Sequence, residues 1–239
     1  MNELTINRIP ELSYVVTEAL NQLRVNLSFS GEDIKVIMIT NSLPNEGKSF
    51  LSIHLWKMLA DVGCTSLLID CDLRNSRFGS RYSISGEGKV KGLAHYLSAN
   101  ADLEEVVYQT NIGNGFMIPN TTSIVNPAIL LESPRFQKMI DSLRGKYQYI
   151  LVDTPPLGSV ADAMNIATHC DGNVLVIRSG ETPRKVVYDS LRLLERTNKP
   201  LLGTVLNRVE ISNRVGYYNR YYHYGDYYNT GSKSKRKKK

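Results

Sequence analysis

Short apolar runs rich in β-branched residues alternate with longer amphipathic segments from residue 35 onward. We expect strands near residues 35–40, 66–70, 148–153, 172–177 and 201–206, and helices near residues 47–62, 133–144, 159–168 and 183–197. The strand segments are apolar on both faces, as in a parallel sheet that helices cover on each side. Residues 75–127 are expected to form loops with short helices near 92–98 and 103–109. The sequence therefore predicts an α/β fold with a doubly wound, mostly parallel sheet.

The composition is typical of a cytoplasmic globular protein. The chain has 239 residues, of which 42% are hydrophobic and 22% are charged, close to the averages for soluble domains. No apolar run approaches the ~20 residues that span a bilayer, and the N-terminus lacks the pattern of a secretory signal. The cysteines, Cys64, Cys71 and Cys170, lack C-x-x-C spacing, which favours reduced thiols over disulfides or a zinc site.

The net charge of +6 comes from the end of the chain. Residues 233–239, KSKRKKK, hold six of the 29 Lys and Arg, which leaves 23 basic and 23 acidic groups in the rest. A neutral body argues against a specific nucleic-acid partner. The basic run fits either a solubilising tail or a segment that contacts a membrane surface.

The pattern of apolar residues divides the chain into three parts. We expect a docking helix within residues 1–30, the α/β domain at 31–207 and a tail at 208–239. The docking helix is indicated by apolar residues spaced three and four apart, namely Leu12, Val15, Val16, Leu20, Leu23 and Leu27. Residues 216–232 contain seven of the 14 tyrosines and no Val, Ile, Leu, Met or Phe, so we expect the isolated tail to be disordered.

The strand near 35–40 leads through the loop NSLPNEGKS into a helical segment. Strand, loop and helix in this order form the context of a phosphate-binding loop, in which Lys48 reaches phosphates and the Ser49 hydroxyl holds Mg²⁺. Ser42 stands where the general pattern G-x-x-x-x-G-K-[ST] has its first glycine. Taken alone, GKS fits an ordinary helix N-terminus equally well.

Carboxylates follow two other apolar strands. Asp70 and Asp72 end the run LLIDCD, and Asp153 ends YILVD. Any one of these aspartates alone fits a turn or helix cap. Because parallel strands end at the same edge of a sheet, we expect all three beside Lys48 and Ser49.

Three motifs in order, SLPNEGKS, LLIDCDLR and ILVDTPP, resemble those of the bacterial tyrosine kinases of capsule and exopolysaccharide synthesis. The form resembled has a cytoplasmic kinase chain separate from its membrane activator, and the likeness covers essentially the full length. It implies a P-loop NTPase-like fold, ATP and Mg²⁺ as cofactors, and autophosphorylation of a C-terminal tyrosine cluster. Such a cluster distinguishes this family from other ATPases of the same fold, and here it consists of Tyr217, Tyr218, Tyr221, Tyr222, Tyr224, Tyr227 and Tyr228.

The resemblance also implies roles for individual residues. Nucleotide binding falls to Asn45, Glu46, Gly47, Lys48, Ser49, Phe50 and Asn207. Catalysis falls to Lys48, Asp70, Asp72 and Asp153, with Ser49, Asp72 and Asp153 as metal ligands. We assign Asp70 as the base, although Asp70 and Asp72 could exchange roles. Asn207 fits a strand-end turn equally well.

Expected partners follow from the same likeness. They are a membrane activator of the polysaccharide co-polymerase type acting through its cytoplasmic segment, a phosphotyrosine phosphatase, and further copies of the chain in a ring. The activator would place the kinase at the inner face of the membrane. Glu18 and Arg24 match the family's ring motif E-x-x-R-x-x-R, but Asn21 replaces one arginine, and Asn45 replaces a loop glycine.

Two other kinds of protein remain as alternatives. A positioning ATPase of the Par or Min type would carry an extra lysine near Leu43 and Pro44. An ATP-dependent ligase of similar fold would have no need for an exposed tyrosine cluster.

Overall fold

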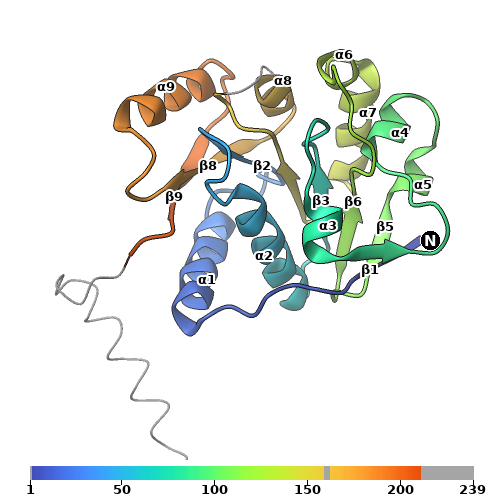
Figure 1. Ribbon diagram of the computed structural model, residues 1–239, viewed down its shortest axis with the longest axis horizontal. Helices are drawn as coiled ribbons and strands as arrows, with labels where there is room; N and C mark the ends of the chain where they lie inside the picture. Colours follow the sequence, from blue (N-terminus) through green and yellow to red (C-terminus); the bar gives the residue numbers. More distant parts are fainter. Residues whose placement is uncertain (1, 159–161, 211–239) are drawn as a thin grey trace, which may run out of the picture.

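A nine-stranded sheet organises the residues that the computed structural model describes, which are 2–158 and 162–210 (Figure 1). The strands are β1 (Asn2–Ile6), β2 (Val36–Asn41), β3 (Ser66–Asp70), β4 (Ile84–Gly86), β5 (Tyr108–Thr110), β6 (Gly115–Ile118), β7 (Tyr149–Asp153), β8 (Gly172–Arg178) and β9 (Leu201–Asn207). The helices are α1 (Tyr14–Ser28), α2 (Lys48–Asp61), α3 (Phe78–Tyr82), α4 (Leu93–Leu97), α5 (Leu103–Val106), α6 (Ala128–Leu131), α7 (Pro134–Arg144), α8 (Asp162–Thr168) and α9 (Arg184–Glu195).

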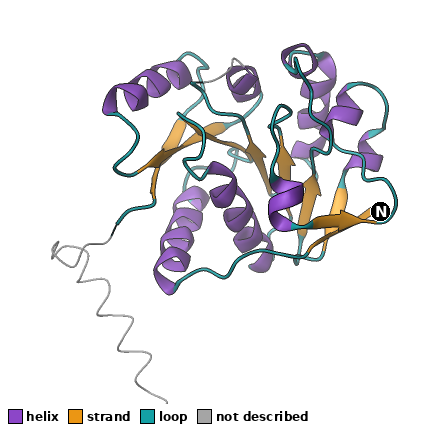
Figure 2. Cartoon of the chain, viewed as in Figure 1, coloured by secondary structure: helices purple, strands orange, loops and turns teal. Residues whose placement is uncertain are grey.

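The strand order is β4-β1-β5-β6-β3-β7-β2-β8-β9. From β6 to β9 every neighbouring pair is parallel, whereas β5–β6 and β1–β4 are antiparallel. Helices lie on both faces of the sheet (Figure 2). The apolar side chains of α1, α2 and α3 pack in one core, and those of α4 to α9 pack in the other. The predicted doubly wound sheet is therefore confirmed.

Strands β2, β3, β7, β8 and β9 match the five predicted from β-branched runs. The short helices expected near 92–98 and 103–109 are also present, as α4 and α5. The interpretation of residues 75–127 as loops and short helices was incomplete, because β4, β5 and β6 lie there. These strands have three or four residues each, too few to show a period.

The N-terminal part contains more than the predicted helix. Helix α1 is present and buries Leu20 and Leu27 in the core that it shares with α2. Before it, β1 pairs with β4 and β5 and buries Leu4 and Ile6. The N-terminal residues therefore form part of the sheet as well as the predicted helix.

The predictions about sulfur chemistry and membrane spans can also be compared with the structure. Cys64, Cys71 and Cys170 are free thiols, as predicted. Among the described helices, none combines the length and the apolar character needed to cross a bilayer. The tail from residue 211 onward lies outside the described residues.

Strand β1, which lies between β4 and β5, gives a direct test of how this side of the sheet is packed. Leu4 is 1% exposed, whereas its neighbour Thr5 points outward. We expect Leu4→Ala to lower the free energy of unfolding by about 3 kcal/mol, because it leaves a cavity in the core. Thr5→Ala keeps the same backbone pairing and should cost about 0.5 kcal/mol or less. Urea denaturation of both variants measures the difference, and equal losses would show that β1 is not packed on the sheet.

Candidate functional site

The loop between β2 and α2 is held in a conformation that few residues adopt. Asn45 has φ 68° and Gly47 has φ 98°, both in the left-handed region that glycine and asparagine tolerate best. A Cβ on Gly47 would lie 1.9 Å from the Asn207 side-chain nitrogen. Glycine is therefore required at position 47 by conformation and by space, while asparagine suffices at 45.

Helix α2 begins at Lys48, so its first backbone N–H groups have no acceptor in the helix. None of the hydrogen bonds found in residues 2–158 and 162–210 uses the N–H of Gly47, Lys48 or Ser49. Free N–H groups at a helix N-terminus attract anions, and the helix dipole adds to this attraction. The loop therefore fits a phosphate group.

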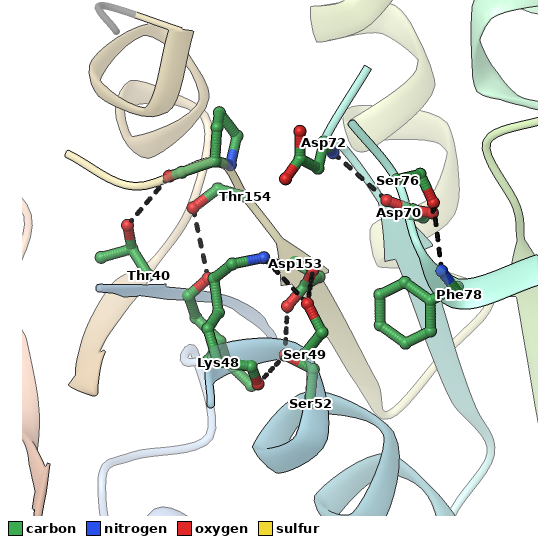
Figure 3. A network of polar contacts seen from close by, with 12 residues as sticks. Thr40, Lys48, Ser49, Ser52, Asp70, Asp72, Ser76, Phe78, Asp153 and Thr154 are labelled. Carbon is green, nitrogen blue, oxygen red and sulfur yellow. Dashed lines mark hydrogen bonds and ion pairs between the residues drawn. The ribbon is translucent and has the colours of Figure 1, made fainter. Parts of the chain in front are cut away.

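Asp153, at the end of β7, is the centre of a buried polar cluster (Figure 3). The Lys48 ammonium forms an ion pair with Asp153 Oδ2. Ser49 Oγ donates to the same oxygen at 2.9 Å, and Ser52 Oγ donates to Oδ1 at 2.6 Å. Both oxygens of a fully buried carboxylate are thus satisfied, as buried charges require.

Asp70 ends β3 and is paired in register with Asp153 on β7. It is fully buried, and it accepts hydrogen bonds from the Ser76 hydroxyl and from the Asp72 N–H. Burial, followed by the nearby Asp153 carboxylate, raises the pKa of Asp70 to about 8. Asp72 is partly buried and accepts from the Asn75 N–H at 3.1 Å.

A cavity of about 290 Å³ opens beside these groups. Its lining includes most of the residues predicted from the sequence, namely Asn45, Gly47, Lys48, Ser49, Asp70, Asp72 and Asp153. The carboxyl ends of β2, β3 and β7 therefore meet at one edge, as expected for parallel strands. Phe50 is outside the lining and packs its ring 4.3 Å from that of His54.

Glu46 and Asn207, also predicted as nucleotide-binding residues, lie behind the loop. The Glu46 side chain is 2% exposed and accepts from the N–H groups of Ser42 and Leu43. The Asn207 amide donates to the Glu46 carbonyl at 2.8 Å. Neither residue lines the cavity.

Arginines stand at one wall of the cavity. The Arg74 guanidinium donates two hydrogen bonds to the buried Asp162 carboxylate and one to the Val125 carbonyl, so it joins the loop after β3 to α8. Arg77 and Arg81 are exposed and line the cavity. Sequence reasoning missed Arg81, although its spacing of four from Arg77 across α3 is a visible signal.

The predicted docking residues lie on α1. Glu18 is exposed and accepts from the Asn21 side chain at 3.3 Å. Arg24 is partly buried. Tyr14, Val25 and the 81% exposed Phe29 leave apolar surface on or beside this helix. The seven predicted acceptor tyrosines lie outside the described residues.

Comparison with known proteins gives consistent matches. Residues 34–184 match the family described as an AAA domain. The chain is 40% identical over 195 residues to tyrosine-protein kinase CpsD of Streptococcus agalactiae, covering 82% of this chain and 84% of that kinase. It is 31% identical over 198 residues to tyrosine-protein kinase YwqD of Bacillus subtilis, covering 82% of each.

Solved structures agree with these sequence matches. The kinase domain of Escherichia coli tyrosine kinase ETK superposes with a TM-score of 0.78 at 27% identity, covering 88% of this chain and 85% of that one. The Pyrococcus furiosus cell division ATPase MinD superposes with a TM-score of 0.62 at 25% identity, covering 75% and 74%.

The raised pKa of Asp70 predicts a pH-dependent stability. Between pH ~4, where an unfolded aspartate titrates, and about 8, the folded protein holds a proton that the unfolded chain has released, so stability falls as pH rises. In metal-free buffer with EDTA, Asp70→Asn should remove this fall and be more stable than the unmodified protein at pH 7.5. Urea denaturation at pH 5 and 7.5 measures it. An equal gain in Asp72→Asn, which is less buried, would contradict burial as the cause.

Proposed function

The chain belongs to the bacterial tyrosine-protein kinases, and we propose that it transfers the γ-phosphoryl group of ATP to tyrosines 217–228 of its own C-terminal segment. The observation that carries this proposal is the shared edge at which Lys48, Asp70 and Asp153 surround one cavity. A phosphate-binding loop and additional carboxylates together suit transfer to a hydroxyl group, which must lose a proton as it attacks.

The loop supplies the contacts for the nucleotide. The N–H groups of Gly47, Lys48 and Ser49 would bind phosphate oxygens, and the Lys48 ammonium would neutralise charge on the transferred group. Behind the loop, Asn207 Oδ1 accepts no hydrogen bond from the described part of the chain. This oxygen is free to accept from the amino group of adenine.

The oxygen atoms near Lys48 fit Mg²⁺. Ser49, Asp72 and Asp153 offer hydroxyl and carboxylate oxygens, the ligand type that Mg²⁺ prefers. The described residues contain no cluster of three His, Cys, Asp or Glu side chains that could hold a metal, and Mg²⁺ commonly needs only one or two carboxylates when phosphates and water complete its shell. Bound there, the cation would neutralise phosphate charge and make the acceptor phenol more acidic.

Asp70 is the proposed base. A phenol has a pKa of ~10, and the pKa of Asp70 is raised to about 8 by burial and by Asp153. Asp70 can accept the phenol proton only when it is ionised, which a cation bound beside it would favour, and its raised pKa then makes it a stronger base than an ordinary aspartate. Ser76, which donates to Asp70 Oδ2, would hold that carboxylate in place. In the alternative arrangement Asp72 is the base and Asp70 takes its place at the metal.

The proposed partners follow from the family. We propose that a membrane protein of the polysaccharide co-polymerase type activates the kinase through its cytoplasmic segment, which brings the chain to the inner face of the membrane. Self-association through α1, with Glu18 and Arg24 on it and exposed Phe29 beside it, would let one copy phosphorylate the tail of another. A phosphotyrosine phosphatase would reverse the modification, and the cycle would regulate capsule or exopolysaccharide synthesis and export.

A positioning ATPase of the Min type is the second candidate, favoured by the superposition on MinD. Against it, Leu43, which Pro44 follows, stands where that type carries an additional lysine. It also gives no role to a cluster of seven tyrosines.

Mass spectrometry tests the proposed reaction. After incubation with ATP and Mg²⁺, with the activator's cytoplasmic segment supplied, we expect phosphate on tyrosines 217–228. Lys48→Met should abolish it, because the charge that stabilises the transferred group is lost. Lys57→Met, which removes a partly exposed lysine that pairs with Asp61 on the same helix and does not line the cavity, is the matched control and should label normally. ATP turnover without phosphotyrosine would favour the ATPase.

Phosphorylation should also loosen the assembly. Each phosphate adds nearly two negative charges to a segment beside the basic run 233–239. We expect light scattering to give a smaller oligomer mass for the phosphorylated protein than for the unmodified one. An unchanged mass would contradict this effect on the assembly. It would not contradict the proposed phosphorylation of the tyrosines.

A further inference from the structure

Glu46 is a buried carboxylate that the phosphate-binding loop itself encloses. It is 2% exposed, although glutamate is rarely buried without partners. Its Oε2 accepts from the Ser42 N–H at 2.7 Å and from the Leu43 N–H at 2.9 Å, and its Oε1 accepts from the Thr182 hydroxyl. The side chain thus points away from the cavity and is fully satisfied by the protein.

Two of these hydrogen bonds are made at the start of the loop, where the general pattern has its first glycine. In the general pattern that glycine occupies position 42, where this chain has a fully buried serine. The carboxylate of Glu46 binds the two N–H groups at the start of the loop, and Pro44 has none. Phosphates are therefore left with N–H groups later in the loop, and those of Gly47, Lys48 and Ser49 are among them.

Glu46 also connects the loop to two distant strand ends. Thr182, which follows β8, is fixed in turn because its hydroxyl accepts from the Arg178 N–H at 3.3 Å. Asn207, at the end of β9, donates to the Glu46 carbonyl at 2.8 Å and packs on Gly47. One residue thereby joins the ends of β2, β8 and β9.

We propose that Glu46 is a positioning residue for phosphoryl transfer, which with Thr182 and Asn207 holds the loop in the conformation that presents its N–H groups to ATP. The inference rests on the proposed use of ATP. The Glu46 side chain contacts protein atoms only, so it affects nucleotide affinity through the shape of the loop.

The direction in which ATP affinity changes separates a positioning role of Glu46 from simple charge repulsion. A carboxylate near a triphosphate repels it, so removing the charge would tighten ATP binding if repulsion were the whole effect. If Glu46 positions the loop, removing its charge should weaken ATP binding. The side-chain amide that Glu46→Gln introduces can still accept both backbone N–H groups with its oxygen, but these bonds lose their charge, and its NH2 group replaces the acceptor that the Thr182 hydroxyl now uses.

The experiment measures binding of a fluorescent ATP analogue with Mg²⁺ to the full chain. We expect Glu46→Gln to weaken binding about tenfold and Thr182→Val about fivefold, as for lost hydrogen bonds to a charged group. Thr182→Ser keeps the hydroxyl and should stay within about twofold. Thr168→Val, which removes an exposed hydroxyl elsewhere, is the matched control and should bind like the unmodified protein.

Two further readouts exclude a merely structural effect. The double variant Glu46→Gln with Thr182→Val should bind no more weakly than Glu46→Gln alone, since both changes break the same interaction. In the kinase assay with activator, Thr182→Val should raise KM for ATP while kcat at saturating ATP and the melting temperature change little.

Several results would overturn the inference. Tighter binding by Glu46→Gln would show that charge repulsion dominates, and unchanged binding by both single variants would show that the loop needs no support from Glu46. Additive losses in the double variant would show that the two residues act separately. If the unmodified protein itself failed to bind the ATP analogue, the proposed function would fall instead.

Discussion

The ion pair between Lys48 and Asp153 fixes the relation between the phosphate-binding loop and the sheet. Both groups are buried, and a buried charge left without its partner is strongly destabilising. The start of α2 is therefore held against the end of β7, and Ser49 and Ser52 satisfy the remaining lone pairs. Asp70 is the register neighbour of Asp153 on β3, and its hydrogen bonds come from Ser76 and from the Asp72 N–H instead of from a cation. The negative charge of Asp153 thus helps to raise the pKa of Asp70, so that Asp70 keeps its proton to a higher pH.

The sequence indicated the long strands better than the short ones. Strands β2, β3, β7 and β8 were predictable because burial on both faces demands continuous apolar runs, and the edge strand β9 was predictable because its seven residues, LLGTVLN, are mostly apolar. Strand β1 has only two buried residues among polar ones. It forms because it pairs with β4 and β5, which lie far from it in the sequence. Pairing of this kind depends on tertiary contacts, which no local period reveals. The four-residue β6 was missed for the same reason.

At the site, residues whose position follows from strand ends were predictable, and residues that act through other side chains were not. Lys48, Asp70 and Asp153 come together because parallel strands end at one edge. Ser52, one turn after Lys48 on α2, could have been found from helical spacing. Thr182 could not, because its partner Glu46 is 136 residues away. Glu46 was assigned to the nucleotide from its motif, but its side chain faces the protein.

The comparison with MinD shows what the fold alone leaves open. The superposition shows a shared fold, and a fold alone does not determine which reaction a protein carries out. The proposed transfer to a phenol needs a proton acceptor beside the phosphate, and burial, followed by the nearby Asp153 carboxylate, raises the pKa of Asp70, the proposed acceptor. That burial lowers stability at neutral pH when no cation is present. The burial of Asp70, which costs stability, is better explained by the proposed chemistry of the site than by the packing of the fold.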